Sequence, residues 1–117
     1  SKTTHMSTLK FSVQGESLSP TKLEAKARQF SFIVDEPPAL GGKDEDANPV
    51  EYLLGSYAGC LNVVFHLVAQ EQGIAIYSLG ITVTGDIDPS KLFGKSALNR
   101  AGFQSINVAL DIDSDAD

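Results

Sequence analysis

The stretch Asn48–Gly73, NPVEYLLGSYAGCLNVVFHLVAQEQG, decides the fold because it predicts one long helix that carries the only cysteine of the chain. Asn48 is a favoured N-cap residue, and Pro49 suits the first helical position because its missing N–H would have no partner there. Gly73 supplies the left-handed residue that commonly ends a helix. We therefore predict a helix from Pro49 to Gln72, about 36 Å long at 1.5 Å per residue.

Apolar side chains cover several faces of this predicted helix, so it needs other structure around it. Its length is close to that of a membrane span, but polar residues shorten the uninterrupted apolar run below the roughly 18 residues that a span needs. We therefore predict a buried core helix and no membrane partner. The interrupting residues are Glu51, Ser56, Asn62, His66 and Glu71.

Length and composition describe an ordinary globular domain. The 117 residues predict a single domain, 1–117, of which 42% are hydrophobic and 21% charged. A net charge of −6 with scattered basic residues argues against binding to nucleic acid. One cysteine and two histidines make a zinc site within one chain improbable, and we predict no metal and no cofactor. No signal-peptide pattern is present, so a cytoplasmic location is expected.

Alternating apolar residues predict strands before the helix. Residues 1–7 are expected to be a flexible N-terminus, and 9–13 alternate as a strand that ends in a turn at 15–20. The segment 22–34 also has period two, but its phase changes near Arg28, which predicts a bulge or a change of packing surface there. The proline-rich and glycine-rich segment 35–46 is predicted to be a loop.

After the helix the pattern again predicts strands. We expect a strand over 74–85, bent at Gly80, and a second, half-buried strand over 104–113. Between them we expect a turn at 86–91 and a loop or short helix at 92–102. The acidic end, 113–117, has the composition of a helix start. One helix among antiparallel strands places the chain in the α+β class.

Cys60 is either a small buried hydrophobic residue or a reactive thiol. It lies 12 residues past Asn48, beyond the reach of the helix dipole, and His66 is about 240° further round the helix. A free thiol is only a few per cent ionised at pH 7, but an arginine close by would favour the thiolate. Arg28 is our first candidate for this arginine and Arg100 our second.

A set of ordered motifs then resembles the OsmC/Ohr superfamily, and its general OsmC-like branch more than the organic hydroperoxide resistance branch. The similarity covers roughly residues 21–117, and the combination of motifs is more specific than any one of them. The motifs are Ala27-Arg28, VDEPPALGG at 34–42, NPVEYLL at 48–54, Ala58-Gly59-Cys60, GDIDP at 85–89 and RAGF at 100–103.

The resemblance implies a fold in which antiparallel sheets pack around a long central helix, and an intertwined homodimer with its sites at the subunit interface. It implies that Cys60 is the peroxidatic cysteine and that Arg28 stabilises its thiolate. The glutamate that follows the Asn-Pro pair in the hydroperoxide resistance branch is Val50 here, and we assign the acid's place to Glu51, which could also serve as a helix cap. The family's resolving cysteine lies in a later helix, so we expect the natural protein to continue beyond Asp117.

Two functions remain open at this point. The first is a thiol-dependent peroxidase of oxidative stress defence, which reduces an organic hydroperoxide at Cys60 and is regenerated by a dithiol reductant. The alternative is a non-catalytic protein of the same fold that binds an apolar small molecule in the interface cleft. The absence of the glutamate favours the alternative, whereas Cys60 and Arg28 favour the peroxidase. A thiol hydrolase fits less well because no histidine is placed to act as a base.

Overall fold

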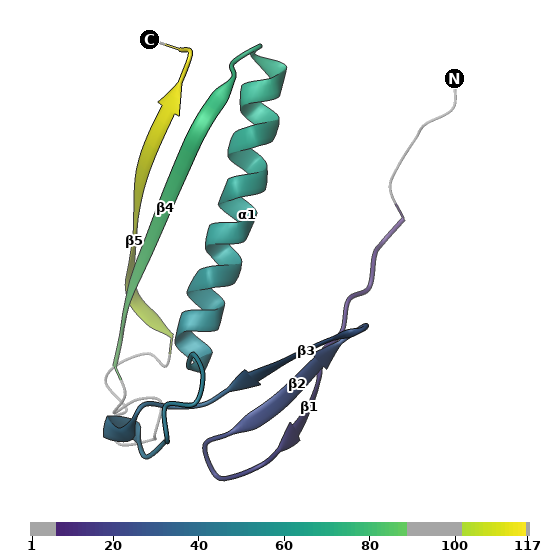
Figure 1. Ribbon diagram of the computed structural model, residues 1–117, viewed down its shortest axis with the longest axis vertical. Helices are drawn as coiled ribbons and strands as arrows, with labels where there is room; N and C mark the ends of the chain where they lie inside the picture. Colours follow the sequence, from purple (N-terminus) through teal and green to yellow (C-terminus); the bar gives the residue numbers. More distant parts are fainter. Residues whose placement is uncertain (1–6, 89–101, 117) are drawn as a thin grey trace. The chain divides into compact units, whose positions relative to one another are not determined.

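The computed structural model describes residues 7–88 and 102–116, and these fall into two compact units divided between Pro49 and Val50. The N-terminal unit holds a three-stranded antiparallel sheet of order β1-β2-β3. The C-terminal unit holds one long helix and an antiparallel two-stranded hairpin (Figure 1). The predicted α+β class, with one long helix and antiparallel sheets, is therefore confirmed.

The N-terminal sheet consists of β1 (Gln14–Ser17), β2 (Leu23–Ala27) and β3 (Phe30–Val34). The strand predicted at 9–13 is wrong: 7–13 has no regular structure, and the first strand begins at Gln14, within or next to the predicted turn. The pairing of β1 with β2 explains the shift, because Gly15 leaves room for the Leu23 side chain on the neighbouring strand. Leu9, Phe11 and Val13 stay exposed.

The change of phase near Arg28 is a two-residue hairpin turn and not a bulge. Ala27 pairs with Phe30 across the turn, so odd-numbered residues of β2 stand opposite even-numbered residues of β3. Both sets therefore lie on one face of the sheet, and the phase reverses without any bulge. This face contains Ala25, the most buried apolar residue of the described chain.

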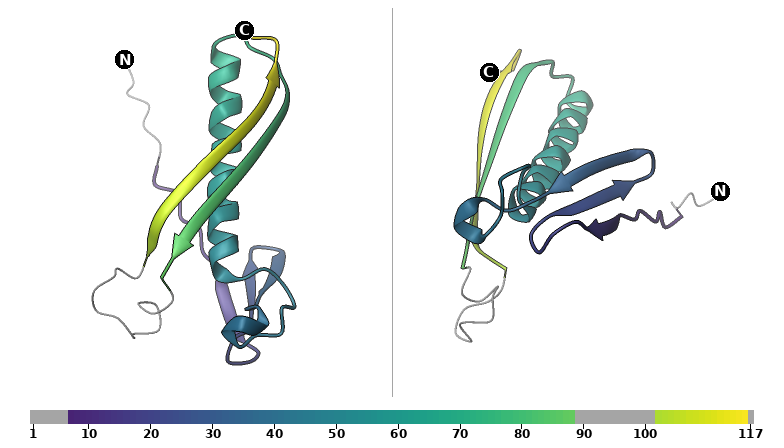
Figure 2. Two further views of the ribbon diagram at one scale, coloured as in Figure 1. Left: turned by 90° about the vertical axis from the view of Figure 1, so that its left-hand side faces the viewer. Right: turned by 60° about the horizontal axis from the view of Figure 1, so that its bottom comes forward.

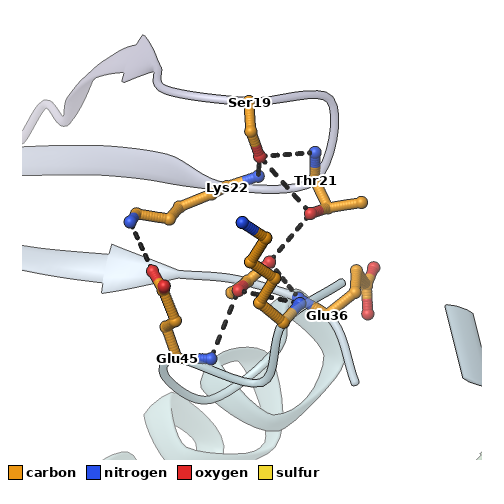
Figure 3. Close-up of polar contacts among 7 residues, drawn as sticks. Ser19, Thr21, Lys22, Glu36 and Glu45 are labelled. Carbon is orange, nitrogen blue, oxygen red and sulfur yellow. Dashed lines mark hydrogen bonds and ion pairs between the residues drawn. The ribbon is translucent and has the colours of Figure 1, made fainter. Parts of the chain in front are cut away.

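The loop after β3 is organised by Asp35, which is 1% exposed. Figure 3 labels Thr21, Glu36 and Glu45, which take part in its network of hydrogen bonds. The Oδ1 atom of Asp35 accepts hydrogen bonds from the Thr21 hydroxyl (2.9 Å) and the Glu36 N–H (2.8 Å). Its Oδ2 accepts from the N–H groups of Lys43 (3.3 Å) and Glu45 (3.2 Å). These bonds close the loop onto the sheet, and a short 3-10 helix, Pro38–Leu40, lies within it.

The helix α1 runs from Pro49 to Glu71, as its cap residues predict. Its C-terminal end is closed by Gly73, with φ of 69°. The Gly73 N–H donates to the carbonyl of Gln70 (3.2 Å), and the Ile74 N–H donates to that of Ala69 (2.8 Å). This is the Schellman arrangement, in which two otherwise unpaired carbonyl groups are satisfied.

The hairpin of β4 (Ile76–Ile87) and β5 (Phe103–Ser114) lies along α1 (Figures 1 and 2). The predicted strand over 104–113 is confirmed, and β4 continues through Ile87 into the predicted turn. The pairing of β4 with β5 shifts register between Ile76 and Ser78 and again between Asp86 and Ile87, but not at Gly80. The rest of the turn and most of the segment 92–102 lie outside the described residues.

The acidic end of the chain completes the hairpin and does not begin a helix within 113–116. Asp113 and Ser114 belong to β5. Asp115 exchanges bonds with Ala75: its N–H donates to the Ala75 carbonyl (3.1 Å), and its carboxylate accepts from the Ala75 N–H (2.9 Å). The acidic composition at this position therefore reflects strand pairing.

The two faces of the hairpin differ in polarity. One face presents apolar residues from both strands, because apolar positions of β4 pair with apolar positions of β5. The other face is polar, apart from Ala109, along the central part of the ladder. The apolar face contains Leu79, Ile81, Val83, Ile106, Val108, Leu110 and Ile112, and the other face contains Thr82, Thr84, Asp86, Ser105, Asn107, Ala109, Asp111 and Asp113.

One stripe of α1 provides the packing surface against this hairpin. Its residues recur at helical spacing and are half-buried or buried: Leu54, Ala58, Leu61, Phe65 and Ala69. Many other apolar side chains of α1 are exposed in the single chain, and these are Leu53, Tyr57, Val63, Val64, Leu67 and Val68. The predicted apolar helix is therefore correct, but one chain covers only one of its faces.

By length and composition α1 could also cross a membrane. The core helix of a globular protein can have the same length and hydropathy, so these two properties do not distinguish a core helix from a membrane-spanning helix. The regular stripe that packs against β4 and β5 favours the core helix that the sequence predicts.

Candidate functional site

Cys60 is an exposed free cysteine in the middle of α1. It lines an open cleft of about 400 Å³ between α1 and the start of β5. The other lining residues are Leu53, Leu54, Ser56, Tyr57, Phe103 and Ile106. Within one chain Cys60 is therefore not the small buried hydrophobic residue that was the first alternative. An exposed cysteine in a cleft can react with a small molecule.

The described residues of the cleft are mostly apolar, and their two polar side-chain groups besides the sulfur are hydroxyl groups. The Ser56 hydroxyl donates to the Leu53 carbonyl one turn earlier in the helix (2.7 Å). The Tyr57 hydroxyl makes no hydrogen bond to any residue within 7–88 and 102–116. An apolar molecule with one polar end matches this lining, since its hydrocarbon part would be removed from water on binding.

Gly85 fixes one wall of the cleft. A side-chain carbon at position 85 would lie 2.5 Å from Cε1 of Phe103 and 3.1 Å from Cδ2 of Leu54. The missing side chain thus leaves the space into which the Phe103 ring and the Leu54 side chain fit. Phe103 and Leu54 both line the cleft of Cys60, so the glycine of β4 shapes the site without touching the sulfur.

The structure does not bring Glu51 to Cys60 within one chain. The two residues are nine positions apart, which places them about 180° apart around the helix. Glu51 lines a different hollow, together with Ile81 and Thr82 of β4. Its predicted place at the thiolate therefore has no support from the geometry of α1.

His66 also lies away from Cys60. Its Nδ1 is 2.8 Å from the Asn62 carbonyl, and it lines a hollow on another face of the helix.

Arg28 lies in the two-residue turn between β2 and β3, with φ of 54°. A positive φ is unfavourable for a residue with a long side chain, and glycine or asparagine is the usual choice. The guanidinium carbon lies 5.0 Å from the centroid of the Phe30 ring, which is a cation–π contact. Arg28 belongs to the N-terminal unit and Cys60 to the C-terminal unit, so their pairing stays a prediction. Arg100 lies outside the described residues.

Within residues 7–88 and 102–116, the structure shifts the pKa values of Asp35 and Lys22. Hydrogen bonds from the Glu36 N–H, the Thr21 hydroxyl and the N–H groups of Glu45 and Lys43 lower the pKa of Asp35. The ion pair with Glu45 raises the pKa of Lys22. Both residues belong to the loop network of the N-terminal unit, so these pKa shifts bear on the stability of the fold.

Among the described residues, no group of three or more His, Cys, Asp or Glu side chains could hold a metal ion.

Sequence reasoning missed Tyr57 and Asp35. Tyr57 had a signal, since it lies three residues before Cys60 and so shares its face of the helix. Asp35 had none, because an acidic residue in a loop of charges is usually exposed.

Comparison with known proteins gives a family and a fold. The model of the family described as OsmC-like protein matches residues 42–117, which is more than half of the chain. The crystal structure of an OsmC-like protein from Mycoplasma pneumoniae superposes with a TM-score of 0.77 at 22% identity, covering 93% of this chain and 72% of that one. At this identity the superposition supports the fold alone. No curated protein matches. With Cys60, Gly85 and Phe103 all inside the matched region, the chain belongs to the OsmC-like protein family.

Proposed function

We propose that this protein is a thiol-dependent peroxidase that reduces organic hydroperoxides at Cys60. The observation that carries the proposal is the position of Cys60, exposed in an apolar cleft on the central helix of an OsmC-like chain. In this proposal the thiolate attacks the terminal peroxide oxygen and becomes a sulfenic acid, and an alcohol leaves. One thiol of a dithiol reductant then condenses with the sulfenic acid to form a mixed disulfide and water, and its second thiol releases the Cys60 thiol by exchange.

Arg28 is proposed as the residue that favours the thiolate. Its unfavourable backbone conformation supports a role beyond the turn itself, because strained positions often persist where a side chain is needed. A guanidinium remains charged throughout the physiological range and would stabilise a nearby thiolate. In a homodimer, this arginine could come from either subunit.

The homodimer itself is also part of the proposal. OsmC-like proteins are typically homodimers, and α1 leaves large apolar side chains exposed in one chain, including Leu53, Val63 and Leu67. A contiguous apolar surface of this kind usually marks an interface. A reducing compartment such as the cytoplasm, where a lone thiol stays reduced, is the proposed location.

The direct test is hydroperoxide consumption by the complete chain. We expect cumene hydroperoxide to be reduced in the presence of a dithiol such as dihydrolipoamide, and Cys60→Ser to abolish the reaction. Ser56→Ala is the matched control, since it removes a hydroxyl from the same cleft and keeps the thiol. If the wild-type protein consumes no hydroperoxide although Cys60 is alkylated normally, the peroxidase proposal is wrong.

The second candidate is a binding protein for an apolar small molecule. The apolar lining of the Cys60 cleft and the valine at position 50 favour it. Saturable binding of a fatty alcohol or similar probe that is unchanged in Cys60→Ser, together with no peroxide consumption, would support this candidate over the peroxidase.

A further inference from the structure

We propose that Tyr57 is a catalytic residue, which donates its phenolic proton to the alkoxide that leaves when Cys60 cleaves an organic hydroperoxide. This inference rests on the proposed function and adds the residue that completes its chemistry. The inference is based on the cleft, in which Tyr57 and Cys60 line one surface together with apolar side chains.

The reaction needs such a donor. The Cys60 thiolate attacks the terminal oxygen of R–O–O–H, an S–O bond forms, and the O–O bond breaks. Sulfur loses two electrons and the peroxide gains them, with the O–O electron pair leaving on RO⁻. An alkoxide is a poor leaving group, so a proton donated as the O–O bond breaks lowers the barrier. The tyrosinate then recovers its proton from water.

Among the described residues that line the cleft, Tyr57 is the available proton donor. Leu53, Leu54, Phe103 and Ile106 have no polar hydrogen. The Ser56 proton is engaged with the Leu53 carbonyl, which is the position that a helical serine commonly takes. The Tyr57 hydroxyl has no hydrogen-bond partner among the residues that the structure describes, so its proton is available.

Position and acidity also suit Tyr57. It precedes Cys60 by three residues, which places the two side chains as neighbours on one face of α1. Both side chains line the same cleft, so one bound hydroperoxide could contact the sulfur and the phenol together. A phenol is a much stronger acid than an aliphatic alcohol, and transfer of its proton to an alkoxide is therefore downhill.

The experiment compares two kinds of peroxide in a single turnover. Oxidation of Cys60 is followed by stopped flow and intact mass, with cumene hydroperoxide and with perbenzoic acid. The first releases an alkoxide that needs a proton, and the second releases a carboxylate that needs none. In Tyr57→Phe, which keeps the ring, we expect oxidation by cumene hydroperoxide to slow by about 100-fold. Oxidation by perbenzoic acid should stay within about threefold of wild type.

Tyr77→Phe is the matched control, because Tyr77 is 66% exposed and does not line the Cys60 cleft, and it should react as wild type with both peroxides. Equal slowing with both peroxides in Tyr57→Phe would assign Tyr57 a packing role and overturn the inference. Unchanged rates with both would overturn it as well. If wild-type Cys60 is oxidised by neither peroxide, this inference and the proposed function both fail, whereas the first two results leave the proposed function standing.

Discussion

The ring of Phe103 occupies the space that a side chain at Gly85 would need, with 2.5 Å between Cε1 and a carbon built at position 85. The contact joins β4 to β5 near the base of the hairpin. It also sets the wall of the Cys60 cleft, so it connects a glycine of the family motif to the candidate site.

Gly85→Ala should therefore cost stability and disturb the cleft. The added methyl group must displace the Phe103 ring, and such overpacking typically costs about 1–3 kcal/mol in the free energy of unfolding. Urea denaturation measures the cost. Gly80→Ala on the same strand is the control, because its nearest side-chain neighbour, Asp111, lies at an ordinary 3.6 Å. Equal stability of the two variants would show that the Phe103 ring moves without cost.

Substitution of Arg28 should separate stability from reactivity. Arg28→Gly relieves about 1–2 kcal/mol of backbone strain and loses a cation–π contact of about 0.5–1 kcal/mol. We expect the free energy of unfolding to stay within about 1 kcal/mol of wild type. The pH midpoint of Cys60 alkylation should instead rise by about 1–3 units, because the charge that favours the thiolate is gone.

Arg28→Lys is the companion variant, since it keeps the positive charge and should retain part of the effect on alkylation. If Arg28→Gly leaves the alkylation midpoint unchanged, Arg28 does not activate Cys60, and the conformation of the turn has another cause.

Asp35 predicts loss of stability in acid. Its pKa is lower in the folded chain than its ordinary value of 3.8, so its carboxylate stabilises the fold at any pH above that value. The contribution is lost as the pH falls below 3.8 and through the lowered pKa. Urea midpoints measured from pH 7 to pH 2.5 should therefore fall in that acidic window.

Asp35→Asn should lower stability at pH 7 and flatten the acid dependence, because the amide nitrogen cannot accept the N–H bonds that one carboxylate oxygen receives. Asp44→Asn in the same loop is the control, as asparagine tolerates the positive φ of 56° found there. Matching acid profiles for wild type and Asp35→Asn would contradict the role given to this network.

The exposed face of α1 predicts a dimer at micromolar concentration. Sedimentation velocity should give a particle of about twice 12.4 kDa for wild type. Leu67→Glu places a charge on an apolar residue that is 55% exposed, and it should dissociate or unfold the protein. Thr84→Glu adds the same charge on the exposed polar face of the β4–β5 hairpin and should remain dimeric. A stable, well-folded wild-type monomer would refute the proposed interface.

The sequence predicts the local features of this fold well where they depend on residue type and spacing. The ends of α1 follow from Pro49 and Gly73, and β5 follows from strict alternation. The β2–β3 turn was mistaken for a bulge because Arg28 is an unusual residue at a positive φ. The first strand was misplaced because its apolar alternation at 9–13 has no partner in the chain's own sheet.

The candidate site also has some features that the sequence predicts and others that depend on tertiary contacts. Cys60 stands out as the only cysteine, and its exposure became clear only from the packing of α1 on the hairpin. The wall made by Phe103 depends on a contact between two strands, and the ring that fills a glycine's space leaves no periodic signal. Glu51 follows Val50 in the sequence but lies about 100° further round the helix, so its role at the thiolate stays a prediction.

The polar face of the β4–β5 hairpin also has a colloidal consequence. In the described part of the chain, β4 and β5 each have one edge without a strand partner, and open edges of this kind can pair with other molecules. Asp86, Asp111 and Asp113 place negative charge along that face and repel a second hairpin. This repulsion weakens as the pH approaches the sequence isoelectric point of about 4.7. Turbidity should therefore rise most steeply near that pH and decline again as the chain becomes positively charged, so purification and storage above pH 7 would keep the protein dispersed.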